Sequence, residues 1–127
     1  MTQKMFVERN FYTREYIHEK LGGGIQSYLP TSNGRVVCAC LSKSLNPRAP
    51  EVILVGLGKI VVKTAEILGH QTDPIPIFVK ESSNSWRFEG EYVSEGFKTD
   101  TATIQKEIVN SGREHVAGVL YLKKVAN

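Results

Sequence analysis

Three consecutive glycines at positions 22–24 constrain the fold of this 127-residue chain more than any other feature. Glycine adopts positive φ angles without steric cost, so the run ends any preceding helix and lets the backbone approach another surface closely. The residues that follow are suited to lining a pocket, because they combine an amide, a hydroxyl, an aromatic ring and a rigid ring: Gln26, Ser27, Tyr28, Leu29 and Pro30. Two interpretations stay open at this point. The run is a recognition loop, or it only caps a helix and turns the chain.

The hydrophobic pattern predicts short elements on both sides of this run. Three helices are predicted: over about 14–21 with Thr13 as N-cap, after Gly58, and from Asp100 or Thr101 to about Asn110. Five strands are predicted at 35–41, 52–55, 77–80, about nine residues around 86–92, and 119–122. Because helices and strands do not alternate strictly, we expect one α+β domain over residues 1–127, built on a small curved sheet or barrel with flanking short helices.

The pattern also predicts the place of individual elements. Residues 52–55 are apolar throughout, so we expect a central strand there. Prolines precede 77–80, so we expect this strand to begin near an edge. Trp86, Phe88 and Tyr92 follow a period of two, which places their rings on one face. The helical periodicity places the following residues on inward faces: Ile60, Val61, Thr64, Ile67, Leu68, Ile104, Ile108 and Val109.

Composition limits the environment in which the chain works. The hydrophobic content of 41% and the charged content of 23% are typical of globular proteins. No apolar run approaches the length of a membrane span, and residues 1–5 lack the apolar core of a signal peptide, so we expect a cytoplasmic protein. Cys38 and Cys40 lie two apart in a predicted strand, where a disulfide would be strained, so we expect buried free thiols.

The positive charge is concentrated in the first half of the chain. The net charge is +3, which mildly favours an anionic partner. The first 50 residues hold only three glutamates, against these cations: Arg9, Arg14, Lys20, Arg35, Lys43 and Arg48. If DNA binds, we expect it on the surface formed by this half. The alternative is an ordinary solvated face.

The motifs that would indicate catalysis are missing. The run Gly56–Ile60 lacks the glycine spacing and the Ser or Thr of a phosphate-binding loop, although its free amide groups could hold a phosphate. No acidic residue is followed two positions later by lysine, as in the common nuclease signature. His18, His70 and His115 lie in three different segments, with no spacing for a metal. We therefore expect no enzyme, no metal and no cofactor.

Several side chains are suited to binding nucleic acid. Arg14 and His18 lie four apart on one helix face, where both can donate to a phosphate. Tyr28 stands in a loop, where its ring could stack on an extruded base. Gln26 and Asn46 carry amides that can read a base edge. Asn46 has a second interpretation, in which it only organises the turn before Pro47.

These residues resemble a known family. The pattern comprises Arg14–Gly23, then Gln26–Pro30, then Asn46–Pro50 leading into Ile53–Gly56, with Ile75–Lys80 and Trp86–Tyr92 as paired strands. It resembles the SRA-like, PUA-like domain of McrA-type type IV restriction endonucleases, over about residues 11–95. In these enzymes an HNH nuclease is joined to a module that recognises modified DNA.

The resemblance implies a curved PUA/SRA-like barrel whose concave face binds duplex DNA and whose pocket holds a flipped modified base. The matching pocket residues are Gln26, Ser27, Tyr28, Leu29 and Pro30, with Asn46 and Pro47 opposite. The matching phosphate contacts are Arg14, His18, Arg48 and Lys59. Nothing in the chain supplies the nuclease, so the resemblance implies a stand-alone reader with a separate nuclease effector, or an excised domain, and the start at Met1 favours the former.

Other functions remain open at this level. Methylcytosine, hydroxymethylcytosine and phosphorothioate DNA are all possible ligands of such a reader. The same barrel could instead bind structured RNA as a PUA-type module. An enzyme acting on a small nucleotide, held at Gly56–Lys59, and a protein-interaction domain of a defence system are further alternatives.

Overall fold

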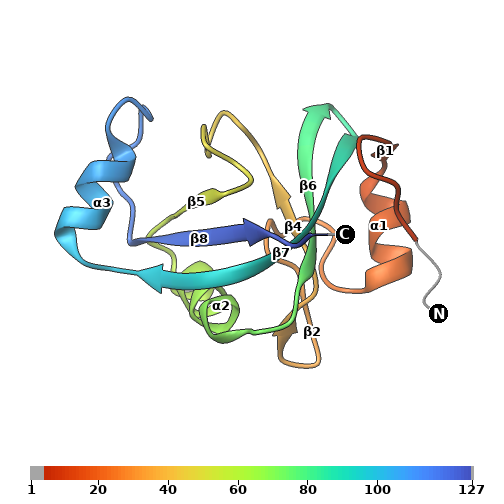
Figure 1. Ribbon diagram of the computed structural model, residues 1–127, viewed down its shortest axis with the longest axis horizontal. Helices are drawn as coiled ribbons and strands as arrows, with labels where there is room; N and C mark the ends of the chain where they lie inside the picture. Colours follow the sequence, from red (N-terminus) through yellow and green to blue (C-terminus); the bar gives the residue numbers. More distant parts are fainter. Residues whose placement is uncertain (1–4, 127) are drawn as a thin grey trace.

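The computed structural model describes residues 5–126, which form a curled mixed sheet, a separate two-stranded sheet and three short helices (Figure 1). The helices are α1 (Arg14–Leu21), α2 (Lys59–His70) and α3 (Thr101–Ile108). The strands are β1 (Phe11–Tyr12), β2 (Thr31–Ser32), β3 (Arg35–Val36), β4 (Ala39–Leu41), β5 (Val52–Val55), β6 (Ile75–Ser82), β7 (Ser85–Lys98) and β8 (Gly118–Lys124). The predicted α+β class, with a curved sheet and flanking short helices, is confirmed. No helix within residues 5–126 is long and apolar enough to cross a membrane.

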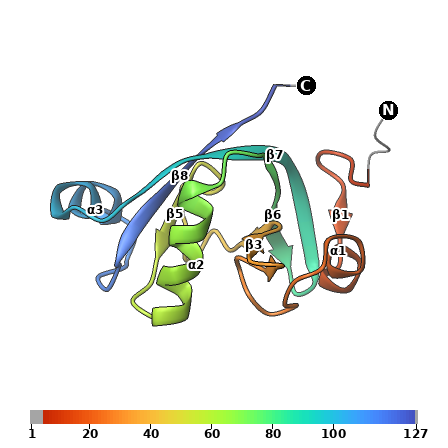
Figure 2. The ribbon, with the colours of Figure 1, turned by 90° about the horizontal axis from the view of Figure 1, so that it is seen from below.

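The sheet is mixed and runs in the order β4-β6-β7-β8-β5, with β1 paired to the start of β7. Only the β4–β6 pair is parallel among these pairings. Strand β7 is long enough to pair with β6 along its first half and with β8 along its second half. It arches over α2, which lies on the concave side of the sheet (Figure 2). The β2–β3 hairpin forms a separate two-stranded sheet.

Strict alternation along the strands divides the buried side chains between the two faces of the sheet. In β5, Ile53 and Val55 belong to the core that includes Ala65 and Leu68 of α2, whereas Val52 and Leu54 pack with α3 residues on the outer face. A third cluster joins α1 to the outer face of the other half of the sheet: Phe6, Ile17, Cys38, Cys40, Phe78, Trp86 and Phe88. The two cysteines are buried free thiols, as predicted.

A β-bulge changes which face the aromatic residues of β7 occupy. Phe78 pairs with Phe88 and Ile77 pairs with Gly90, so Glu89 is an extra residue on β7. Gly90 takes φ 113° at this point. The extra residue shifts the alternation, and Tyr92 packs in the concave core while Trp86 and Phe88 pack on the outer face. The prediction that these rings share one face was wrong for this reason.

Strand β6 begins at an edge of the sheet, as predicted, because Ile75 and Pro76 pair with β7 and β4 joins the strand from Ile77 onward. Three other predictions about elements were wrong. Strand β5 ends the sheet instead of lying at its centre. The predicted strand 35–41 is divided into β3 and β4. Ile60 and Val109 are exposed, because Ile60 stands on the solvent side of α2 and Val109 follows the last turn of α3. Apolar composition predicts burial, and the position of a strand in the sheet depends on pairings that are distant in sequence.

The glycine run both caps α1 and brings two segments together. Thr13 Oγ1 accepts a hydrogen bond from Tyr16 N at the start of the helix, as predicted, and Gly22 N donates to His18 O at its end. Gly22 and Gly23 both have φ 83°. A Cβ atom on Gly23 would lie 2.6 Å from Cβ of Pro30, so the backbone here packs directly against the segment leading to β2.

Replacing Gly23 by alanine tests this close approach. We expect Gly23→Ala to lower the free energy of unfolding by about 2–5 kcal/mol, because it adds a contact with Pro30 to the strain of a positive φ. Gly34→Ala is the matched control, because Gly34 has φ 78° and no atom within 4 Å of its Cβ position. We expect a smaller loss there, about 1–2 kcal/mol. Chemical denaturation followed by circular dichroism measures both, and equal losses would show that the Pro30 contact relaxes at no cost.

Candidate functional site

Arg14 is half-buried and is held by contacts within the chain. Its Nε donates to His18 Nε2 at 2.8 Å, and its Nη2 donates to the Ser27 carbonyl oxygen at 2.7 Å. The guanidinium carbon lies 5.0 Å from the centre of the Trp86 ring, a cation–π contact. Arg14 therefore fastens the segment after the glycine run to α1 and β7.

His18 completes this arrangement. Because Nε2 accepts from Arg14, the proton of the neutral ring lies on Nδ1, which contacts the Gly22 carbonyl oxygen at 3.0 Å. The sequence correctly placed Arg14 and His18 on one helix face, but their polar atoms are engaged within the chain. To contact a phosphate through these atoms, the two side chains would first have to break their hydrogen bonds to each other and to the backbone of Gly22 and Ser27.

The predicted pocket wall, residues 26–30, divides into an exposed part and a core part. Gln26 and Ser27 are exposed, whereas Leu29 and Pro30 are buried. Tyr28 lies between them and packs against the concave core. Among residues 5–126 its buried hydroxyl has no hydrogen-bond partner, and burial raises the pKa of Tyr28 to about 12. These five side chains thus divide between the surface and the core.

Asn46 uses both ends of its amide on the backbone, as in the second interpretation of this residue. It is 4% exposed, its Oδ1 accepts from Leu54 N at 2.8 Å, and its Nδ2 donates to Ser42 O at 3.3 Å. Arg113 Nη1 donates to Leu54 O at 2.9 Å and to Leu45 O at 3.0 Å. The two side chains thus satisfy Leu54 N and O at the free edge of β5, and Asn46 is buried there with both ends of its amide bound to the backbone.

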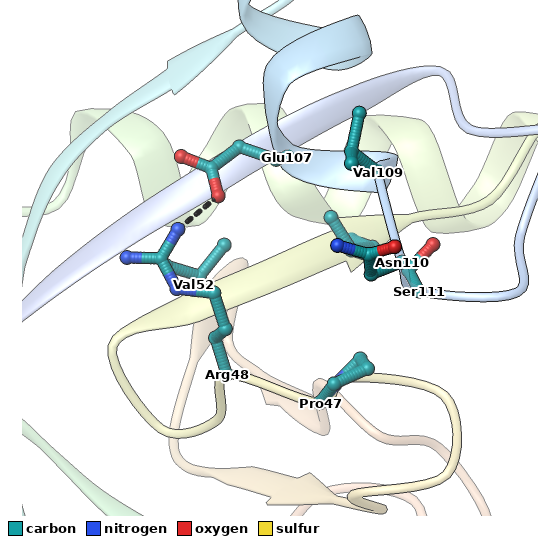
Figure 3. Close-up of a pocket in the computed structure, with 8 residues that line it drawn as sticks. Pro47, Arg48, Val52, Glu107, Val109, Asn110 and Ser111 are labelled. Atoms are coloured by element: carbon teal, nitrogen blue, oxygen red, sulfur yellow. Dashed lines mark hydrogen bonds and ion pairs between the residues drawn. The ribbon is translucent and has the colours of Figure 1, made fainter.

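A cavity of about 320 Å³ opens beside this edge, on the outer face of β5 (Figure 3). It lies between the loop before β5 and the end of α3, and its lining residues are Pro47, Arg48, Val52, Leu54, Glu107, Val109, Asn110 and Ser111. Two of these, Pro47 and Arg48, are among the residues that the sequence predicted for DNA binding. The walls are largely apolar, with polar groups at one side and at the mouth.

Glu107 is the buried polar residue of this cavity. Its side chain is 1% exposed and forms an ion pair with Arg48, whose own side chain is largely exposed at the mouth. Its other carboxylate oxygen accepts a hydrogen bond from the Tyr121 hydroxyl at 2.5 Å. Burial and this hydrogen bond to Glu107 raise the pKa of Tyr121 to about 12, so the phenol stays protonated and donates at neutral pH.

Beyond the end of β5, the start of α2 is exposed and free of acidic residues. Gly58 is the N-cap without a side-chain hydrogen bond, and the first turn contains no carboxylate. Leu57 and Ile60 are 60% and 82% exposed on either side of Lys59. Arg113 lies between the end of β5 and the cavity wall: its Nη2 would lie 3.7 Å from a Cβ atom on Gly56, and its backbone N–H donates to Ser111 Oγ.

Of the four predicted phosphate contacts, Arg48 lines the cavity and Lys59 is the first residue of α2. Arg14 and His18 lie in α1, at the other end of the sheet. Lys59 is exposed, and no ion-pair partner of it is found among residues 5–126. Other cations of the first half are bound to carboxylates, with Arg35 paired to Asp73 and Lys20 to Glu19. Counting the cations of a segment therefore overstates the positive charge that its surface presents to an anionic ligand.

Comparison with known proteins gives one match. A family model described as a domain of unknown function, DUF6697, matches residues 11–110. The chain belongs to the DUF6697 family. No curated protein and no solved structure matches it. The DUF6697 match runs from the start of β1 to just beyond α3, so it includes every lining residue of the cavity except Ser111.

Sequence reasoning missed Glu107, although a signal for it was present. Ile104, Glu107 and Ile108 are spaced as one face of a helix, and an acidic residue on such a face must find a partner. That partner, Arg48, is 59 residues away, so only the fold brings the two together. Within residues 5–126 no group of three or more His, Cys, Asp or Glu side chains is arranged to hold a metal ion.

The ion pair of the cavity should contribute more to stability than a surface pair. We expect Arg48→Ala to lower the free energy of unfolding by about 1–3 kcal/mol, because it leaves the buried Glu107 carboxylate with one donor. Arg35→Ala is the control, since the Arg35–Asp73 pair is exposed on both sides and should contribute about 0–1 kcal/mol. Urea denaturation of the two variants measures the difference. Equal losses would contradict a special role for burial of Glu107.

Alkaline pH should destabilise the fold through Tyr28. Its pKa is near 10 in the unfolded chain and about 12 in the fold, so the folded state holds the proton more tightly. This stabilisation, at most about 2–3 kcal/mol, is complete below pH 10 and is lost as the pH rises toward 12. We expect the free energy of unfolding to fall across that window, and to fall less steeply in Tyr28→Phe. Denaturation curves at several pH values would show this, and an unchanged slope in the variant would exclude Tyr28 as the cause.

Proposed function

We propose that this DUF6697 chain is a non-catalytic DNA-binding module that recognises modified DNA, with the modified base extruded from the duplex into the Glu107 cavity. The proposal keeps the function that the sequence resemblance implies. It moves the base pocket from residues 26–30 to the cavity lined by Pro47 and Arg48. Cleavage of the marked DNA would belong to a separate nuclease partner.

The cavity is the single observation that carries the proposal. Its volume, about 320 Å³, lies at the lower end of the range of ligand pockets, roughly 300–1,000 Å³, which suits a ligand the size of one base. Val52, Leu54 and Val109 offer apolar surface for the base and for an added methyl group. Glu107 forms the polar side of the cavity, where its buried carboxylate is bound by Arg48 and Tyr121. Flipping a base costs a few kcal/mol, and a pocket with these contacts can offset that cost.

The duplex itself would lie across the mouth of the cavity and the start of α2. Lys59 and Arg113 flank this path, and the first turn of α2 has no carboxylate to repel phosphates. Arg48 stands at the mouth, where its exposed guanidinium can contact a phosphate beside the extruded base. Leu57 and Ile60 project from the same end of α2, and apolar side chains of this kind can enter a gap between base steps.

Binding to a set of matched duplexes tests the proposal. We expect fluorescence anisotropy to show tighter binding to duplexes with methylcytosine or hydroxymethylcytosine than to unmodified and phosphorothioate duplexes, and to weaken as salt rises. Val109→Trp should fill the cavity and abolish the preference while binding to unmodified DNA remains. Val7→Trp is the matched control, because Val7 is also an exposed valine but lies before β1.

The outcomes separate the alternatives. Binding that is weak and equal for all duplexes would contradict the DNA-reader function and direct the same assay to structured RNA. A preference that survives in Val109→Trp would keep a DNA reader but remove the cavity as its pocket. Lys59→Gln should weaken binding to every duplex alike and reduce the salt slope by about 1.

A further inference from the structure

The polar side chains that line the Glu107 cavity differ in whether they are already engaged within the chain. The Glu107 carboxylate is 1% exposed, and both its oxygens are bound by side chains of the protein. Ser111 Oγ accepts a hydrogen bond from Arg113 N at 3.0 Å. Asn110 is exposed, and among residues 5–126 no hydrogen bond of its side chain is found. Its amide is therefore a polar group of the cavity wall that a ligand can reach without breaking a contact of the protein.

The backbone presents this amide from a defined position. Asn110 has φ 64°, and Ser111 N donates to Ile108 O at 2.9 Å, so a main-chain hydrogen bond closes the turn after α3. Asparagine is favoured at such positions because its side chain can hydrogen-bond the turn locally. Here the main chain makes that bond, and the amide extends to the side of the loop on which Val52 lies (Figure 3). In contrast, the amide of Asn46 is bound to the backbone at both ends.

Resting on the proposed function, we infer that Asn110 binds the Watson–Crick edge of the extruded base. A side-chain amide presents an acceptor oxygen beside a donor NH₂ group. Cytosine carries the complementary pair on its rim, where the exocyclic amino group donates and the adjacent ring nitrogen accepts. One asparagine can form both hydrogen bonds with one base, as asparagine does with the amino group and ring nitrogen of adenine in the major groove.

The apolar walls of the cavity make this contact necessary for tight binding. Val52, Leu54 and Val109 offer surface to the ring and to an added methyl group, but they form no hydrogen bonds. A base that enters such a cavity exchanges water for apolar surface, and its rim groups lose hydrogen bonds unless the protein replaces them. Asn110 supplies the replacement, so removal of either partner leaves the other without its hydrogen bond.

Two base analogues test the contact directly. 5-Methylcytosine and 5-methyl-2-pyrimidinone have the same ring and the same methyl group, and the second lacks the exocyclic amino group. Each is placed opposite an abasic site in otherwise identical duplexes, so that base pairing does not affect extrusion. Fluorescence anisotropy should show about 5- to 30-fold tighter binding to the 5-methylcytosine duplex, which is the effect of one hydrogen bond to a buried group.

The Asn110→Gly variant shows whether this asparagine is responsible. Glycine accepts a positive φ, so the substitution removes the amide and keeps the turn. We expect the preference between the two duplexes to fall to about twofold or less. Asn33→Gly is the matched control, because Asn33 is also an exposed asparagine with a positive φ, 54°, but lies between β2 and β3 and does not line the cavity. It should keep the wild-type preference.

A second variant and a folding control make the result independent of the backbone. Asn110→Ala removes the same amide and should lose the preference in the same way. Circular dichroism and thermal melting establish that all three variants are folded.

Failure of this inference differs from failure of the proposed function. Salt-dependent binding with equal affinity for the two analogues would overturn the role of Asn110 and leave a DNA-binding module. A preference that persists in Asn110→Gly, or that is lost equally in Asn33→Gly, would also overturn it. Absence of binding to every duplex would instead remove the proposed function, and the inference with it.

Discussion

The backbone polar groups at the free edge of β5 are satisfied by two side chains from outside the sheet, those of Asn46 and Arg113. Pairing with β8 satisfies one side of this strand, and its other side presents Leu54 N and O away from the sheet. Asn46 and Arg113 bind these two atoms, which also protects the edge from pairing with another chain. Because Asn46 lies in the loop before β5 and Arg113 in the loop after α3, the same contacts fix both walls of the Glu107 cavity.

Local sequence signals predicted the local structure well. The Thr13 cap, the bounds of α1, the Asp100 cap of α3 and the apolar strand 52–55 each follow from neighbouring residues, and all are present. The errors arose where pairing between segments distant in sequence determines the position of a strand or the face that a side chain occupies. One extra residue opposite the Ile77–Phe78 step of β6 moves Tyr92 to the other face of the sheet, and the sequence contains no periodic sign of this bulge beyond Gly90.

The candidate site was predictable to a similar extent. Pro47, Arg48 and Lys59 come from segments rich in turn residues and cations, and they lie around the cavity and the start of α2. Arg14, His18 and Asn46 have the right chemistry for nucleic acid, but their polar atoms satisfy the chain's own backbone or each other. A polar side chain near a glycine run or a turn tends to hydrogen-bond the backbone of that turn, because unsatisfied backbone groups are costly to bury.

The contacts of Arg14 with His18, Ser27 and Trp86, called here the Arg14 clamp, include a fluorescent side chain. Trp86 is the single tryptophan, and the guanidinium of Arg14 and the ammonium of Lys80 both contact its buried ring, at 5.0 Å and 5.8 Å from the ring centre. Its indole environment thus depends on how α1 and the glycine-run segment sit against β7. The Glu107 cavity is lined from the other end of the sheet, by the loop before β5, by β5 and by the end of α3 (Figure 1). Tryptophan emission therefore reports on the Arg14 contacts at one end of the sheet, away from the cavity at the other end, so the two ends can be observed separately in one sample.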